Sequence, residues 1–171
     1  MSPKISPDAF ISENAVIIGD VEIGPGSSVW FNCVVRGDVN AIRIGSNTNI
    51  QDGTIIHVNH DRSGEDYRKT GGGLQTIIGD GVTVGHMALL HACSIADHAF
   101  IGMRSVVMDA AVVQSDAMVA AGALVTPGKI VPTGELWSGS PAKKFRDLKP
   151  DELEGIRYSA RNYAELGQSY S

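Results

Sequence analysis

The sequence is poor in cysteine and aromatic residues and has no long hydrophobic run. Aromatic side chains make up 6% of the 171 residues, and the two cysteines, Cys33 and Cys93, form neither a Cys-x-x-Cys pair nor a disulfide framework. No segment approaches the roughly 20 apolar residues that cross a bilayer, and no basic segment followed by a hydrophobic one opens the chain. These absences predict a soluble, unexported protein of a reducing cytoplasm.

Basic charge is also scarce. Fourteen Lys and Arg residues against nineteen Asp and Glu give a net charge of -5, and no basic cluster forms a track for nucleic acid. Hydrophobic residues reach 43% and charged residues 19%, a balance that excludes disorder over most of the chain. We therefore expect one folded domain that binds neither nucleic acid nor membrane.

A six-residue repeat of aliphatic residues dominates the sequence. It runs in four stretches: Ile5, Ile11, Ile17, Ile23, Val29 and Val35; Ile44, Ile50 and Ile56; Ile78, Val84 and Leu90; and Ile95, Ile101, Val107, Val113, Val119, Val125 and Val131. Four places after many of them comes a small residue, such as Cys33, Ser94 or Ala99. A period of six fits neither a helix nor an ordinary meander, but it fits one short strand followed by one corner, with both residues pointing inward.

This pattern resembles the hexapeptide-repeat proteins. The resemblance implies an all-β solenoid, a left-handed parallel β-helix of triangular section with about 18 residues per coil. We predict this β-helix over residues 1–142, with an inserted loop at 58–77 that lacks the repeat and is rich in glycine and charge. Residues 143–171 are predicted to be a helical segment packed on the same domain. Its helix should begin near Pro150 and carry one apolar stripe of Leu153, Ile156, Ala160 and Tyr163.

Three of the five histidines fall on predicted corners. His57 and His91 lie 34 residues apart, which equals one coil of about 18 once the roughly 16 extra residues of the loop are removed. We therefore expect their imidazoles to stack on one edge of the prism and to share one Zn²⁺, with Fe²⁺ or Co²⁺ as other candidates. His86 lies on a different edge, so the third ligand should come from a neighbouring subunit of a closed homotrimer.

Charged and amide side chains recur at the corners. The same arithmetic places Asp52 under His86, with Gln51 beside it, near the open side of the metal. Arg36 and Asp38 are predicted to lie at another corner, where the planar guanidinium suits ion pairing across an interface.

The remaining histidines and the cysteines have no such register. His60 and His98 are interpreted as plain surface residues. Cys33 falls on an inward slot and is interpreted as a core residue, whereas Cys93 lies close to the histidine corner.

Five motifs together resemble the γ-class carbonic anhydrase family over nearly the whole chain: Val35-Arg36-Gly37-Asp38, Asn49-Ile50-Gln51-Asp52-Gly53, Ile56-His57-Val58, Val84-Gly85-His86 and Leu90-His91-Ala92-Cys93. The resemblance implies that His57 and His91 of one subunit and His86 of the next bind zinc at each interface of a homotrimer. The implied reaction is the reversible hydration of CO2 to bicarbonate.

The same resemblance implies roles for five further residues. Gln51 would contact the metal-bound hydroxide or the substrate. Arg36, Asp38 and Asp52 would form the interfacial ion pairs. Tyr163 would project from the helix into the site.

The chain departs from the pattern of the strongly active members of the family, in which a glutamate follows the Arg-Gly-Asp and a loop glutamate shuttles protons. Here Val39 follows Asp38, and no spacing places the loop residues Glu65 and Asp66 beside the metal. Two other functions stay open. One is a hexapeptide acyltransferase or thioesterase acting on acyl-CoA, and the other is a metal-binding scaffold with weak or no catalysis.

Overall fold

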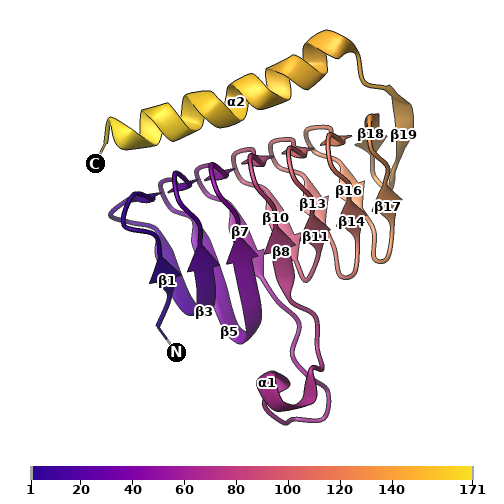
Figure 1. The fold of residues 1–171 in the computed structure, drawn as a ribbon. Coiled ribbons are helices and arrows are strands. Elements are labelled where there is room, and N and C mark those ends of the chain that lie inside the picture. The colour runs from indigo at the N-terminus through magenta and orange to yellow at the C-terminus, as the bar shows by residue number, and fades with distance from the viewer. Residues whose placement is uncertain (1, 171) are drawn as a thin grey trace.

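The chain is a β-helix with one long helix at its side. The computed structural model describes residues 2–170; Met1 and Ser171, the outer limits of the two predicted ranges, lie outside the described residues. The coils form a left-handed parallel β-helix, and Figure 1 shows them stacked side by side along one axis. The predicted fold class is confirmed.

Each coil contributes short strands to three faces. The first face holds β1 (Lys4–Ile5), β8 (Thr76–Ile78), β11 (Ser94–Ile95), β14 (Val112–Val113) and β17 (Ile130–Val131). The second holds β2 (Phe10–Ile11), β4 (Ser28–Val29), β6 (Asn49–Ile50), β9 (Thr83–Val84), β12 (Phe100–Ile101), β15 (Met118–Val119) and β18 (Glu135–Gly139). The third holds β7 (Ile55–His57), β10 (Leu89–His91), β13 (Val106–Val107) and β16 (Leu124–Val125), while β3 (Val16–Ile23) and β5 (Val34–Ile44) run from the third face around a corner into the first.

The core is a column of stacked aliphatic residues. The strands pair in parallel with the next coil, as Val107 with Val125 and Val113 with Val131, and the repeated aliphatic residues lose nearly all solvent contact. One inward slot differs from the prediction. Leu90 and Ile95 are five positions apart instead of the usual six. Cys93 therefore fills the inward slot expected for Ser94, and it is 1% exposed.

Close approach of the coils demands glycine next to some core positions. A Cβ on Gly85 would lie 2.8 Å from the backbone nitrogen of Met103 in the next coil, well inside van der Waals contact. The residue before His86 is therefore held by backbone packing, which fixes where that corner turns.

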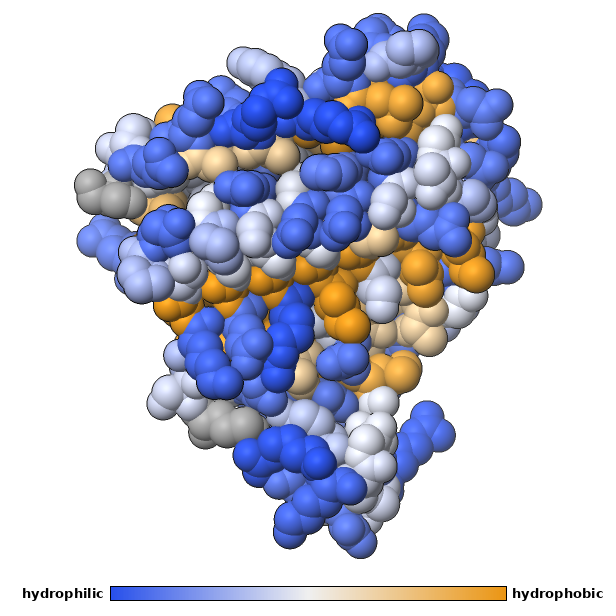
Figure 2. Space-filling view, viewed as in Figure 1, coloured by the Kyte–Doolittle hydropathy of each residue, from blue (hydrophilic) through white to orange (hydrophobic). Residues whose placement is uncertain are grey.

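The inserted loop is shorter than predicted. Val58 is buried and β8 already begins at Thr76, so the repeat resumes before residue 77. Between these points the chain forms an antiparallel bridge of Asn59 with Leu74 and one short helix, α1 (Tyr67–Thr70). The loop projects from the body (Figure 1), and its surface is mainly hydrophilic (Figure 2).

The C-terminal part differs in one respect from the predicted helical segment. Residues of β19 (Ala142–Asp147) pair antiparallel with β18 before the helix begins. The helix α2 (Pro150–Gln168) starts at the predicted proline and contacts β4, β6 and β9 of the second face, with Ile156 and Ala160 buried. Within residues 2–170 no helix is long and apolar enough to span a membrane.

An ion pair joins β19 to the first turn of α2. The two terminal nitrogens of the Arg146 guanidinium, Nη1 and Nη2, donate to Glu152 at 2.7 Å. The backbone nitrogen of Lys149 donates to the same carboxylate at 2.9 Å. The Arg146 hydrogen bond, followed by that of Lys149, lowers the pKa of Glu152 from 4.5 to about 2.

We predict that this pair makes the stability of the protein depend on acid pH. Because the pKa of Glu152 is lower in the folded than in the unfolded chain, its contribution is complete above about pH 4.5 and is lost as the pH falls towards 2. The melting temperature of Glu152→Gln should therefore lie below that of the wild type at pH 6, by a small amount for so exposed a pair, and the gap should close with acid. Glu154→Gln, an exposed change on the same turn, is the control; an equal, pH-independent gap in both variants would contradict the assignment.

Candidate metal centre

Two histidines stack on the corner between the third and first faces, here called the histidine edge. The strands β7 and β10 pair with His57 opposite His91, so the coil arithmetic of the sequence is confirmed. His57 Nδ1 lies 3.2 Å from His91 Nε2. Both side chains are partly buried, with 20% and 33% of their surface exposed.

Each of these imidazoles is held from behind by a carboxylate. His57 Nε2 lies 3.0 Å from Asp38 Oδ1, and His91 Nδ1 lies 2.5 Å from Asp109 Oδ1. Burial raises the pKa of Asp38 and Asp109, but hydrogen bonds from His57 and Arg36 to the first, and from His91 and Asn59 to the second, outweigh it and place both pKa values below the ordinary one. Because an ionised carboxylate only accepts hydrogen bonds, the protons sit on His57 Nε2 and His91 Nδ1.

The two remaining nitrogens therefore face each other with lone pairs. Such an arrangement repels unless a cation lies between them, either a shared proton or a metal ion. Two nitrogens bound to one tetrahedral zinc at about 2.0 to 2.1 Å are about 3.3 Å apart, which matches the separation of His57 Nδ1 and His91 Nε2. The donor pair thus fits a zinc-like ion.

The third predicted ligand lies on another corner. His86 follows β9, at the corner between the second and third faces, here called the His86 edge. Asp52 Oδ2 lies 2.8 Å from His86 Nδ1, so this pair stacks as the spacing predicts. Among residues 2–170 no three histidine, cysteine or acidic side chains meet at a point that could hold a metal ion. Within one chain, the His57–His91 pair and His86 therefore lie on two different edges.

Gln51 lies beside Asp52 on the His86 edge. It is 5% exposed, and its Nε2 donates to Asn49 Oδ1 at 3.0 Å. This hydrogen bond uses one of the two amide hydrogens and fixes which end of the carboxamide faces Asn49.

Arg36 and Asp38 lie at a different corner from Asp52 and His86, as expected, and this corner is the histidine edge. Val35 pairs with Ile56, and Asp38 contacts both Arg36 and His57. Three extra residues in the long strand β5 stretch this coil to 21 residues. Subtracting them, as the loop residues were subtracted for the histidines, would have put Arg36 in register with His57.

The sequence analysis did not predict a role for Asp109. It lies 18 residues after His91, which is one regular coil. Counting one further coil from His91 would have pointed to it. The one-residue slip after Leu90 hid it, since it displaces the aliphatic repeat but leaves the histidine and the aspartate in line.

Tyr163 projects from α2 towards the His86 edge. Its ring meets Trp30 edge-on with a centroid separation of 5.6 Å. Burial first, and then the negative charge of Asp52, raise the pKa of Tyr163. The helix thus brings the phenol into the electrostatic reach of the carboxylate that holds His86.

The acidic loop residues lie closer to the histidine edge than their spacing reveals. Glu65 and Asp66 line a groove of about 460 Å³ together with His60 and Asp38, and Asp38 contacts His57. His60 is exposed, as predicted.

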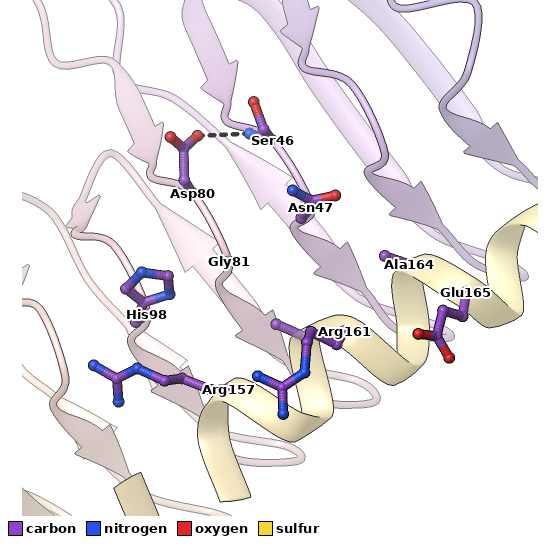
Figure 3. Close-up of a pocket in the computed structure, with 10 residues that line it drawn as sticks. Ser46, Asn47, Asp80, Gly81, His98, Arg157, Arg161, Ala164 and Glu165 are labelled. Atoms are coloured by element: carbon purple, nitrogen blue, oxygen red, sulfur yellow. Dashed lines mark hydrogen bonds between the residues drawn. The ribbon is translucent and has the colours of Figure 1, made fainter. Parts of the chain in front are cut away.

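The corner between the first and second faces carries a groove of about 400 Å³ against α2 (Figure 3). His98 lines it, so its interpretation as a plain surface residue is wrong: the ring covers Gly81, and Nδ1 is buried without a hydrogen-bond partner among residues 2–170. Arg157 pairs with Asp116 at 2.9 Å, and Asp80 accepts a hydrogen bond from the Ser46 backbone. Neither the His57–His91 pair nor His86 lies at this corner.

The outer side of the third face is an apolar ladder that lies between the histidine edge and the His86 edge. Its residues are paired coil to coil and point away from the core: Val16, Val34, Ile55, Leu89, Val106 and Leu124. Ile55 remains 45% exposed and Val16 49%. A continuous apolar strip of this kind on one chain is typical of a contact surface.

The two cysteines are predicted to be inert in the folded protein. Burial raises the pKa of Cys33 to about 11 and that of Cys93 to about 12, so neither forms the thiolate that reacts. A chromogenic disulfide reagent at pH 8 should label neither thiol in the native state and both after denaturation. Rapid labelling of native Cys93 would contradict its place in the core behind the histidine edge.

Comparison with known proteins agrees with this architecture. The bacterial transferase hexapeptide family (six repeats) matches residues 2–37. Gamma carbonic anhydrase 2, mitochondrial, of Arabidopsis thaliana is 48% identical over 99% of the chain and 59% of its own length. The carbonic anhydrase of Geobacillus kaustophilus is 45% identical over 99% and 86%. The crystal structure of a hexapeptide transferase family protein from Anaplasma phagocytophilum has a TM-score of 0.89 at 45% identity and covers 99% and 93%.

The lengths of these relatives differ. The chain spans between 59% and 64% of three Arabidopsis gamma carbonic anhydrases, but most of the length of the bacterial carbonic anhydrase. Identity of this level over the whole chain, on a shared hexapeptide fold, establishes common descent. The chain belongs to the gamma carbonic anhydrase-like family of hexapeptide-repeat proteins.

Proposed function

We propose that the protein is a zinc-dependent γ-class carbonic anhydrase-like enzyme that hydrates CO2 reversibly to bicarbonate at the interfaces of a homotrimer. The observation that carries the proposal is the pair of lone-pair nitrogens 3.2 Å apart on the histidine edge, each imidazole held by its own carboxylate. The named activity of the bacterial relative at 45% identity supports the same reaction.

The third ligand in this proposal is His86 of a neighbouring protomer. The apolar ladder lies between the histidine edge and the His86 edge, so burying it against a neighbour brings opposite edges together. In a closed three-fold ring each protomer offers one edge and receives the other, and every ladder is covered. Asp52 then orients His86 as Asp38 and Asp109 orient the other two histidines.

The chain's own groups divide the remaining work. An ion held by three imidazoles supplies, when bound, a water acidified towards neutral pH as the nucleophile for CO2. Arg36 holds Asp38 and thereby the orientation of His57. Gln51 offers its carboxamide oxygen to a hydroxyl of the nucleophile or product, and Tyr163 closes the helix side of the His86 edge. Glu65, Asp66 and His60 line the groove at Asp38 through which a proton reaches solvent.

Zinc sharing between protomers predicts complementation. His57→Ala and His86→Ala proteins should each bind no zinc when expressed alone. In a mixed trimer one interface joins an intact histidine edge to an intact His86, so co-expression should restore about one site per mixed trimer. Metal analysis of mixed trimers purified through two different tags measures this. Zinc retained by the His86→Ala protein alone, or none in the mixed trimer, would overturn the shared site.

The reaction itself is tested by stopped-flow CO2 hydration with a pH indicator. The zinc-loaded protein should accelerate hydration, and His57→Ala and His91→Ala should fall to the uncatalysed rate because the metal is lost. Acyl-CoA consumption by metal-free protein would instead favour the acyltransferase or thioesterase alternative. Bound metal without turnover of CO2, esters or thioesters would favour a scaffold.

A further inference from the structure

Both carboxylate oxygens of Asp109 accept hydrogen bonds. Oδ1 accepts from His91 Nδ1 at 2.5 Å, and Oδ2 accepts from Asn59 Nδ2 at 2.7 Å. A carboxylate fixed at both oxygens cannot rotate, so the imidazole that it holds keeps one orientation. Asn59 is therefore the second link in a chain that ends at a metal-binding nitrogen.

Asn59 is also the base of the inserted loop. Its backbone exchanges hydrogen bonds with Leu74 at 2.9 and 3.1 Å, which closes the loop at its neck. Asn40, 4% exposed, donates to the carbonyl oxygens of Asn59 and Gly72 at 3.1 and 3.2 Å and ties the neck to β5. On the other strand of the neck, the Thr76 hydroxyl donates to the His57 carbonyl oxygen at 2.6 Å.

The loop beyond the neck has little else to order it. Its helix α1 buries no residue, and the Tyr67 hydroxyl donates a hydrogen bond from this helix to Asp20 of the body. Residues of the neck thus contact both histidines of the histidine edge, His91 through Asp109 and His57 through the Thr76 hydroxyl.

We propose that Asn59 is a positioning residue that couples the 58–77 loop to the metal ligand His91 through Asp109. This inference rests on the proposed metal site and names a regulation of it. Because coupling between two equilibria is reciprocal, loss of the Asn59 link weakens zinc binding, and zinc binding in turn stabilises the closed neck.

The first test measures zinc affinity by competition with a chelator. Asn59→Leu keeps the side-chain size but removes the donor to Asp109, and it should weaken zinc binding by roughly 10- to 100-fold, as loss of a partner behind a metal ligand does. Gln114→Leu, which likewise replaces an amide by leucine but at the corner between the first and second faces, is the matched control and should bind zinc like the wild type. Circular dichroism and melting curves check that both variants fold.

A swap separates positioning from mere structural damage. Asn59→Asp alone sets two carboxylates against each other and should bind zinc most weakly. Adding Asp109→Asn restores the chain, since the new amide donates to residue 59 and its oxygen accepts from His91 Nδ1. The double variant should therefore recover affinity relative to Asn59→Asp. Failure to recover would show that Asn59 does not act through Asp109.

The reciprocal effect is read by amide hydrogen exchange. Zinc should slow exchange of the Leu74 and Asn59 amides in the wild type but not in Asn59→Leu. Unchanged zinc affinity in Asn59→Leu would overturn this inference and leave the proposed enzyme intact. A wild-type protein that binds no metal would overturn both.

Discussion

The whole structure depends on the pairing of each short strand with the strand one coil away. Strands of two or three residues have no stability of their own, and only the ladder between coils satisfies their backbone groups. Because that ladder runs in parallel and in register, a side chain at a corner stands directly beside the residue one coil later. Residues one coil apart in the sequence therefore line up in a column along the β-helix.

The histidine edge uses this rule to build a polar site on a closed apolar prism. The core accepts only aliphatic and small residues, so the imidazoles lie at the corner, where they are partly buried and still reach the surface. The column continues from His57 through His91 to Asp109, one coil at each step. The carboxylates hold both imidazoles in place, so the proposed ligand nitrogens would need no reorganisation to bind a cation.

The three faces differ in what covers them. The second face carries α2, which buries Ile156 and Ala160 against it. The third face exposes the apolar ladder between the histidine edge and the His86 edge. The proposed trimer would bury this ladder and complete the proposed metal site in one event, although no metal cluster lies within residues 2–170 of a single chain.

Local spacing was enough to predict the period of six, the stacking of His57 on His91, the pairing of Asp52 with His86 and the helix that begins at Pro150. These features follow from counting residues, because a regular coil converts sequence separation directly into position. Counting failed where the coil is irregular. The three extra residues in β5 hid the register of Arg36 with His57, and the slip after Leu90 put Cys93 in the slot expected for Ser94 and hid Asp109. Only the tertiary structure decided the hydrogen bond from Asn59 to Asp109 and the burial of His98 Nδ1. Asn59 belongs to the inserted loop, which has no repeat, and packing sets the direction in which each of these side chains points.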